Sequence, residues 1–338
     1  MTRDCAFATQ DCSFRYRAAA LLERGGRVLL VSSASHGALG LPGGAVHLDE
    51  TAADAARREL FEETGLHAAP VRLIALHECF FDTPAPAPAP RAHVVELVFL
   101  MRIEGEDAPL PPGDGDETPR WVAPDALGAV RLFPPALREW LRTRPTGIQH
   151  WVTRENTPLS ELLGADCCFT GESVWFRYRA AVIAPEGDAV LMAHFTPENY
   201  DYAVGGGVYL DETAEDAALR EAWEETGVRF ETERLAVINE SFFDGRGTLS
   251  GRRAHVLEVY FLLKPRGTTA LHPPQGEDAG AHYLPIETLD TTEHFPLFLR
   301  DYLRERPQTA LHLVTRENEP PRPAPSTPAA QPPMTDEG

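Results

Sequence analysis

The chain has 338 residues, 43% of them hydrophobic, and a formal net charge of −20 at pH 7. This length suits about two domains. The acidic balance lacks the cationic footprint that binds DNA or RNA polymers, and it disfavours an anionic membrane surface. No apolar run reaches the roughly 18 residues of a membrane span, and the N-terminus lacks the apolar stretch of a signal peptide. We therefore expect a cytoplasmic protein, which also fits its five cysteines remaining reduced.

The sequence contains the same text twice. The stretch FRYRAA recurs 162 residues after its first occurrence, and VTREN recurs at the same spacing. No insertion is needed between these landmarks, so we predict two domains of one fold, at 13–156 and 175–318, joined by a linker at 157–174. The proline-rich segment 319–338 cannot build a core, and we predict that it is disordered.

Each copy predicts the same order of elements. An alternating strand, FRYRAA, is followed by a turn and a second strand, RVLLVSS or AVLMAHF. A glycine-rich loop then leads to a helix, where Thr51 with Asp54 resembles a capping box and Gly65 is typical of a helix end. Two long strands and a short amphipathic helix follow. The last segments, GIQHWVTREN and TALHLVTREN, could form strands that cross between the halves. This order predicts an α/β (α+β) sandwich.

The helix after the glycine-rich loop carries a cluster of glutamates on one face. Glu59, Glu62 and Glu63 lie at positions i, i+3 and i+4, and the second copy repeats these offsets. Like charges at this spacing destabilise a bare helix by roughly 0.2–0.5 kcal/mol per pair, whereas a divalent cation would stabilise it. Mg²⁺ binds through a few carboxylates plus substrate phosphates. The expected ligands are Glu59, Glu62 and Glu63, then Glu221, Glu224 and Glu225, with the carbonyls of Gly43 and Gly205.

These segments resemble the Nudix signature, G-x5-E-x7-R-E-U-x-E-E-x-G-U, where U is a bulky aliphatic residue. The first copy matches every defined position, and the second departs only at Ala222, where a larger aliphatic residue is expected. The matching residues are Gly44, Glu50, Arg58, Glu59, Leu60, Glu62, Glu63, Gly65 and Leu66, then Gly206, Glu212, Arg220, Glu221, Glu224, Glu225, Gly227 and Val228. The resemblance implies two tandem Nudix-type α/β/α sandwiches. It also implies Mg²⁺- or Mn²⁺-dependent hydrolysis of a nucleoside diphosphate linked to another moiety.

The resemblance suggests roles for further residues. We expect Arg58 and Arg220 to orient the ligands, while Glu50 and Glu212 either orient these arginines or bind the metal through water. The general base remains open, and the candidates are Glu63 and Glu225 on the helices, Glu96 and Glu258 on a later strand, and Glu117 in a loop. His93 and His255 should face away from Glu96 and Glu258, because residues three apart on a strand point to opposite sides.

Basic and aromatic residues outside the signature are candidate substrate contacts. Arg15 and Arg17, like Arg177 and Arg179, could contact phosphate or ribose, or could lie on an ordinary exposed strand face. One ring of the Phe80–Phe81 pair, and Phe243 in the second copy, could stack on a base, although core packing is favoured. The possible small-molecule substrates are nucleotide sugars, ADP-ribose, dinucleoside polyphosphates and non-standard dNTPs. Alternatives are a catalytically silent nucleotide-binding sensor or a single active domain. Since many Nudix proteins are homodimers, we expect the two domains to pack as an intramolecular pseudo-dimer.

Overall fold

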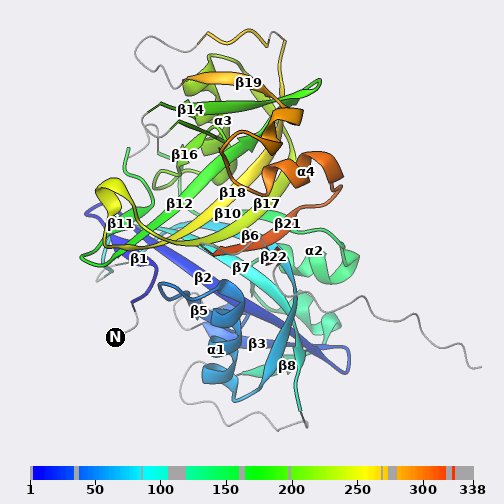
Figure 1. The fold of residues 1–338 in the computed structure, drawn as a ribbon. Helices are drawn as coiled ribbons and strands as arrows, with labels where there is room; N and C mark the ends of the chain where they lie inside the picture. Colours follow the sequence, from blue (N-terminus) through cyan, green and yellow to red (C-terminus); the bar gives the residue numbers. More distant parts are fainter. Residues whose placement is uncertain are drawn as a thin grey trace, which may run out of the picture.

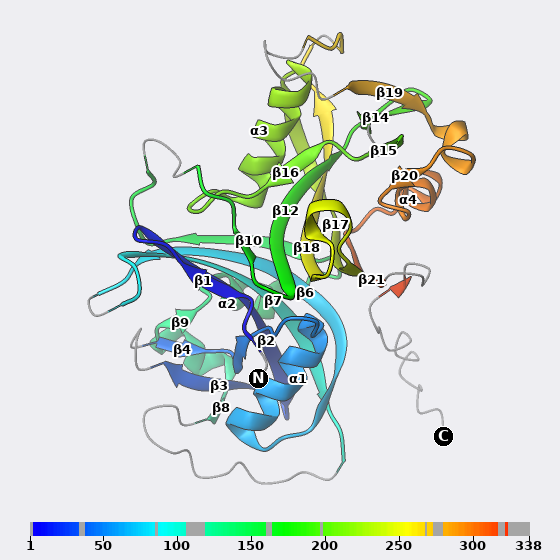
Figure 2. The ribbon, with the colours of Figure 1, turned by 60° about the vertical axis from the view of Figure 1, so that its left-hand side comes forward.

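The computed structural model describes residues 3–33, 38–84, 87–105, 119–159, 164–196, 199–267, 269–272, 280–316 and 322–323. Two copies of one mixed α+β fold follow each other along the chain (Figure 1). In Figure 2 the first copy lies below the second, with α1 in the lower copy and α3 in the upper one. We call the two copies the first half and the second half.

The first half is built on one mixed sheet with the strand order β10-β6-β7-β2-β3-β4-β9. Strands β1 and β5 pair with β2, and β8 pairs with β3. The strands are β1 (Ala6–Ala8), β2 (Cys12–Arg24), β3 (Arg27–Ser33), β4 (Ala38–Gly40), β5 (Gly43–Ala45), β6 (Ala68–Asp82), β7 (Arg91–Ile103), β8 (Arg120–Val122), β9 (Leu132–Phe133) and β10 (Gln149–Arg154). The helices are α1 (Ala52–Thr64) and α2 (Ala136–Thr143).

The two helices of the first half cover opposite faces of this sheet. Alternate residues of β2 pack into different cores: Ala18 and Ala20 share a core with α1, whereas Leu21 shares another with Leu137 and Trp140 of α2. Side chains alternate across a strand, so the two cores lie on the two sides of the sheet. The predicted sandwich is therefore confirmed in this half.

The second half repeats this plan with its strands divided between two sheets. One sheet has the order β11-β12-β18-β17-β21-β22 with β16 on β12, and the other has the order β13-β14-β15-β20 with β19 on β14. The strands are β11 (Cys168–Thr170), β12 (Val174–Ile183), β13 (Pro185–Glu186), β14 (Ala189–Phe195), β15 (Tyr200–Tyr202), β16 (Gly205–Gly207), β17 (Phe230–Asp244), β18 (Arg253–Pro265), β19 (Ala281–Pro285), β20 (His294–Phe295), β21 (Leu311–Arg316) and β22 (Arg322–Pro323). The helices are α3 (Ala214–Thr226) and α4 (Leu299–Glu305).

The ends of α1 match the signals in the sequence. The Thr51 side chain accepts a hydrogen bond from the Asp54 amide, which satisfies one of the free N–H groups of the first turn. At the other end, Gly65 adopts a left-handed conformation with φ 68° and donates its amide to Phe61. Helix α3 begins and ends in the same way.

The last strand of each half pairs within its own half. The prediction that the VTREN strands cross between the halves is wrong, because β10 pairs in parallel with β6 and β21 with β17, each in its own half. The edge strand of each sheet offers unpaired backbone groups that a following strand satisfies locally. Within the segment predicted to be disordered, Arg322–Pro323 pair with β21. The rest of that segment lies outside the described residues.

The two halves share one hydrophobic core, and their contacts are reciprocal. Phe14 and Tyr16 of β2 lie 5.8 and 6.0 Å from the ring of Phe176 in β12, measured between ring centroids. The Cys5 sulfur lies 3.5 Å from His255 Nδ1, and the matching Cys167 sulfur lies 3.4 Å from His93 Nδ1. In each pair the cysteine of one half contacts the histidine of the other, and the two pairs are related by the 162-residue offset. Identical chains contact each other in this way at a two-fold interface.

The two interface histidines predict a loss of stability in acid. Burial lowers the pKa of His93 to about 4 and that of His255 to about 3. Below a pH of about 6.5 the unfolded chain takes up protons that these folded imidazoles do not, so acid favours unfolding. When the pH falls from about 7 to about 5.5, we expect the titration of each histidine to lower the free energy of unfolding by roughly 1 kcal/mol. Urea denaturation at the two pH values measures this change.

The double variant His93→Gln/His255→Gln provides the comparison for this measurement. It should lose less stability than the wild type on acidification, because neither glutamine titrates. If wild type and variant show the same pH dependence, the interface histidines are not responsible for the acid sensitivity.

Candidate active site

In the first half, one arginine organises the predicted carboxylates. Arg58 donates two hydrogen bonds to Glu50 at 2.9 Å, one to Glu59 at 2.6 Å and one to Glu62 at 3.3 Å. It also donates to the carbonyl of Ala45 in β5, which ties the helix to the glycine-rich segment. Burial raises the pKa of Glu50, but the hydrogen bonds and charge of Arg58 together with the bond from the His47 amide outweigh this effect, and the net pKa is lowered. Glu50 is therefore a carboxylate at neutral pH.

The second half reproduces this arrangement. Arg220 donates to Glu212 at 2.8 and 2.9 Å, to Glu221 at 2.6 Å and to Glu224 at 3.0 Å. Its guanidinium also lies over the ring of Tyr209, 4.0 Å from the ring centroid. Burial raises the pKa of Glu221 above its usual value. The arginine–glutamate geometry thus occurs twice, although Ala222 replaces the larger aliphatic residue of the signature.

The glycine-rich strands β5 and β16 lie directly against these carboxylates. A Cβ on Gly44 would stand 2.2 Å from the carboxylate of Glu59, and one on Gly206 would stand 2.3 Å from that of Glu221. The amide of Gly205 donates to Glu225 Oε1 at 3.1 Å. Glycine is therefore required where the loop closes on the carboxylate, in both halves.

The donor chemistry fits a hard divalent cation, because carboxylate oxygens are ligands that Mg²⁺ and Mn²⁺ prefer. In this structure arginine side chains bind several of these carboxylates. Within the described parts of the chain, no three His, Cys, Asp or Glu side chains converge to hold a metal. The Glu62 side chain is 57% exposed and has room to turn from Arg58. The carbonyls predicted as ligands are occupied too, since Gly43 accepts from Arg17 and Gly205 from Arg179.

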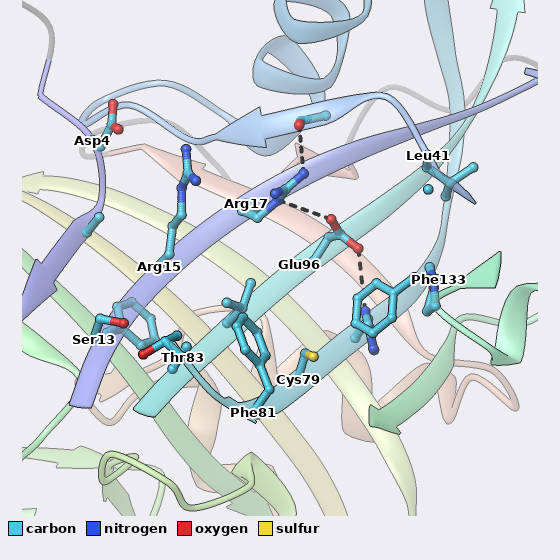
Figure 3. A pocket seen from close by; sticks show the side chains of 18 of the residues that line it. Asp4, Ser13, Arg15, Arg17, Leu41, Cys79, Phe81, Thr83, Glu96 and Phe133 are labelled. Carbon is cyan, nitrogen blue, oxygen red and sulfur yellow. Dashed lines mark hydrogen bonds and ion pairs between the residues drawn. The ribbon is translucent and has the colours of Figure 1, made fainter. Parts of the chain in front are cut away.

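A cavity of about 690 Å³ opens beside the first carboxylate helix. Figure 3 shows Arg15 and Arg17 of β2 on one side of it and Phe81 and Glu96 from β6 and β7 on the other. Gly43 and Glu63 also line it, as do His77, Cys79 and Phe133. The cavity thus brings together predicted residues from the helix, the first strand and the later strands.

Glu96 is the acidic side chain on the strand side of this cavity. It is 8% exposed and lies 3.4 Å from His77 Nδ1. It also lies 3.3 Å from Arg17 Nε, and a dashed line joins Glu96 to Arg17 in Figure 3. Burial raises its pKa, but the bonds with His77 and Arg17 outweigh this and lower it. In the second half, Glu258 instead accepts from Asn239 at 2.7 Å and from Tyr260 at 3.0 Å. The two halves therefore differ beside the same glutamate.

Sequence reasoning missed His77 as a cavity residue. The repeat did contain the signal, because HECFFD in the first copy reads NESFFD in the second and so exchanges histidine for asparagine. His93 and His255 lie buried between the halves and not beside Glu96 or Glu258, as the strand spacing predicts. The loop glutamate Glu117 lies outside the described residues.

Of the aromatic and basic residues predicted to contact substrate, some line the cavity and others pack or pair elsewhere. Phe80 is fully buried, whereas its neighbour Phe81 lines the cavity. Phe243 packs edge-on against Trp175, with 6.4 Å between ring centroids. Arg177 pairs with Asp166 at 3.1 Å and so is engaged elsewhere in the present arrangement.

Comparison with known proteins identifies the family. The NUDIX domain model matches residues 14–143 and again 176–305. These matches cover more than half of the chain, which belongs to the Nudix hydrolase family and carries two Nudix-type domains in tandem. Among the described residues, no helix is both long and apolar enough to span a membrane.

Individual relatives match one half. Phosphatase NudJ from Escherichia coli K12 is 37% identical over 109 residues, which make up 31% of this chain and 65% of NudJ. The chain thus spans less than two thirds of the length of the curated relatives it matches. Among solved structures, a NUDIX hydrolase from Nitrosomonas europaea is 19% identical at a TM-score of 0.34, over 44% of this chain and 82% of its own. An ADP-ribose pyrophosphatase from Streptococcus suis 89-1591 is 24% identical at a TM-score of 0.29, over 41% and 97%.

Proposed function

We propose that the protein is a Mg²⁺- or Mn²⁺-dependent hydrolase that cleaves the diphosphate linkage of a nucleoside diphosphate joined to another moiety. The observation that carries this proposal is the repeated packing of a glycine strand on arginine-held glutamates, beside a cavity that presents Arg15 and Arg17 in the first half. The cavity combines cationic and aromatic side chains, which suits the phosphates and the base of a nucleotide. The curated relatives are phosphatases by name, which agrees with phosphate chemistry.

In this proposal the helix glutamates hold the metal. Glu59, Glu62 and Glu63 serve the first site, and Glu221, Glu224 and Glu225 serve the second. The bound metal would supply charge neutralisation at the phosphates and a lowered pKa for water. Arg58 and Arg220 hold Glu50 and Glu212 and keep the ligands in place when the cation is absent. Arg17 donates to the carbonyl of Gly43, and the second lone pair of that oxygen is available to a cation.

Each proposed site has two candidates for the general base. Glu63 lines the cavity next to Gly43, and Glu96 faces it from the opposite side. Glu96 is ionised at neutral pH but is already bonded by Arg17 and His77. Glu225 and Glu258 are the corresponding candidates in the second half.

The organisation of the chain is part of the proposal. We take 13–156 and 175–318 as the two domains and propose that they form an intramolecular pseudo-dimer in the cytoplasm. Their reciprocal buried contacts support this arrangement. The different partners of Glu96 and Glu258 support two active sites with different substrates, rather than one active domain.

A nucleotide screen with Mg²⁺ and Mn²⁺ tests the function. It covers ADP-ribose, nucleotide sugars, dinucleoside polyphosphates and oxidised dNTPs, for the wild type beside Glu62→Gln, Glu224→Gln and the double variant. We expect the wild type to hydrolyse at least one class and the double variant to be inactive. Tight nucleotide binding without turnover in the wild type would favour the sensor alternative.

A substitution in the cavity tests the proposed base contact. We expect Phe81→Ala to raise KM of the first site by about tenfold with little change in kcat, because aromatic stacking is worth roughly 1–3 kcal/mol per base. Steady-state kinetics in the Glu224→Gln background measures this effect. An unchanged KM would show that Phe81 packs against the protein and does not contact the base.

A further inference from the structure

Glu78 is a charged residue buried between the two halves. It lies in β6 of the first half with 0% exposure, and it accepts a hydrogen bond from His150 of the same half at 2.7 Å. Its other hydrogen-bond donors belong to the second half: the hydroxyl of Tyr178 at 3.1 Å and the backbone amide of Ala214 at 2.9 Å. Ala214 is the first residue of α3, the helix that carries the second set of predicted metal ligands.

Glu240 makes the reciprocal contacts from β17. It is also fully buried, and it accepts from His312 of its own half at 2.9 Å. From the first half it accepts the Tyr16 hydroxyl at 3.3 Å and the amide of Ala52 at 2.6 Å. Ala52 is the first residue of α1, so each carboxylate helix begins on a glutamate from the other half.

Such a contact has a physical consequence for the helix. The first turn has free N–H groups and a positive end of the helix dipole, so a carboxylate there is favourable. The threonine cap satisfies only the Asp54 amide, and Glu240 satisfies the amide of Ala52. Glu59 lies about two turns further along the same rigid helix. A displacement of the helix start at Ala52 is therefore expected to move all the glutamates of α1 together.

The charge state of Glu78 suits this contact. Burial raises its pKa, but His150, His93 and the Ala214 amide outweigh the burial, and the net pKa is lowered. Burial lowers the pKa of His150 in turn, but Glu78 outweighs that effect and raises it. A carboxylate thus faces the start of α3 at neutral pH.

The loop before each helix is held across the same interface. Asp211, immediately before Glu212, accepts from Arg91 at 2.8 Å and from Arg154 at 2.9 Å, both in the first half. Asp49, immediately before Glu50, accepts from Arg253 of the second half at 2.9 Å. Each signature segment is therefore fixed from the opposite half at its loop and at its helix start.

We propose that Glu78 is a positioning residue for the second active site and Glu240 is one for the first, so that each half aligns the metal-binding helix of the other. The catalytic consequence rests on the proposed function, whereas the alignment of the helices does not. Both glutamates are fully buried, so both act through the helix and not on substrate.

Hydrogen–deuterium exchange of the full-length, metal-free chain tests the alignment. We expect Glu78→Gln to speed amide exchange at 211–226 by about tenfold, because a neutral amide accepts a weaker hydrogen bond from the Ala214 amide than a carboxylate does. Exchange at 49–64 should change less than about twofold. Glu240→Gln should give the opposite pattern. Faster exchange in the variant's own half, or equally in both halves, would overturn the proposal.

Two further variants separate alignment from loss of folding. Phe169→Leu alters the same interdomain core without touching either helix start, so it should affect both helices alike. If Glu78→Gln fails to fold, Tyr178→Phe removes one donor to Glu78 while the Ala214 amide stays bonded. It should still speed exchange at 211–226 more than at 49–64. Equal changes at both helices would overturn the proposal here as well.

Binding of Mn²⁺ alone, followed by electron paramagnetic resonance, tests the consequence for the sites. Glu78→Gln should weaken Mn²⁺ binding by about tenfold when only the second site is intact, in the Glu62→Gln background. In the Glu224→Gln background, where the first site remains, binding should be unchanged. If the wild type binds no Mn²⁺ and hydrolyses nothing, the proposed function fails while the exchange measurement still decides the alignment.

Discussion

Replacing Gly44 with alanine is expected to weaken Mn²⁺ binding at the first site by about 100-fold, with the fold retained. The added Cβ would stand 2.2 Å from the carboxylate of Glu59. Because that carboxylate is the far end of a flexible side chain, it can move away at little cost to folding. In the proposed site, a displaced Glu59 no longer serves as a ligand. Mn²⁺ titration in the Glu224→Gln background measures the loss, and thermal unfolding checks the fold.

The neighbouring glycine provides a contrast within the same strand. A Cβ on Gly43 would stand 2.3 Å from the carbonyl oxygen of Ala18 and 2.7 Å from the Cα of Ala19, both in the paired strand β2. Backbone cannot move aside, so Gly43→Ala should cost about 3 kcal/mol of folding stability. Gly128→Ala is the matched control, since its Cβ would meet nothing within 4 Å. If Gly44→Ala unfolds the protein as Gly43→Ala does, the Glu59 carboxylate is not free to move.

The second large effect is expected at the loop before α3. Asp211→Asn should lower the free energy of unfolding by about 3 kcal/mol, because removing one partner of a buried ion pair leaves the other uncompensated. The Asp211 side chain is 1% exposed and accepts from Arg91 and Arg154. Asparagine keeps the shape and tolerates the left-handed backbone, which has φ 70° here. Denaturant unfolding measures the difference.

Asp49 is the matched position in the first half. It has the same left-handed backbone, with φ 65°, but its side chain is 52% exposed and it pairs with Arg253 at 2.9 Å. An exposed ion pair contributes about 0–1 kcal/mol, so Asp49→Asn should cost little. Equal costs at the two positions would show that burial does not distinguish them.

Further donors contribute to the burial of Asp211. Asn156 and the amide of Leu159, at the end of the first half, also donate to Asp211. The corresponding stretch after the second half lies outside the described residues, apart from Arg322–Pro323. Leu159 belongs to the segment predicted as the linker, which therefore also contacts the second candidate site.

The local features of the fold could be predicted because their causes are local. The Thr51 cap and the Gly65 end of α1 depend on neighbouring backbone groups, and the positions of Glu59 and Glu62 follow from helical spacing. Gly44, which packs against Glu59, belongs to the same sequence signature. Each of these features therefore joins residues that lie within one short segment of the chain.

Contacts between distant segments could not be predicted in the same way. Glu78 lies in a strand, and nothing near it in sequence indicates the helix that it contacts 136 residues later. The final strands were predicted to cross the interface because the repeat suggested two halves, yet each strand stays in its own sheet. Pairing partners depend on which sheet edge is free, and this is a property of the assembled fold.

Each half contains both the carboxylate and the helix start that the reciprocal contact needs. If two copies of the first half paired in the same way, Glu78 of each copy would lie at Ala52 of the other. One of these contacts would repeat the one between Glu78 and Ala214, and the other the one between Glu240 and Ala52. This is the arrangement expected when the gene for a self-pairing single domain is duplicated and fused. Fusion fixes the partner, so the two sites are inherited together and are free to diverge, as His77 and Asn239 have done.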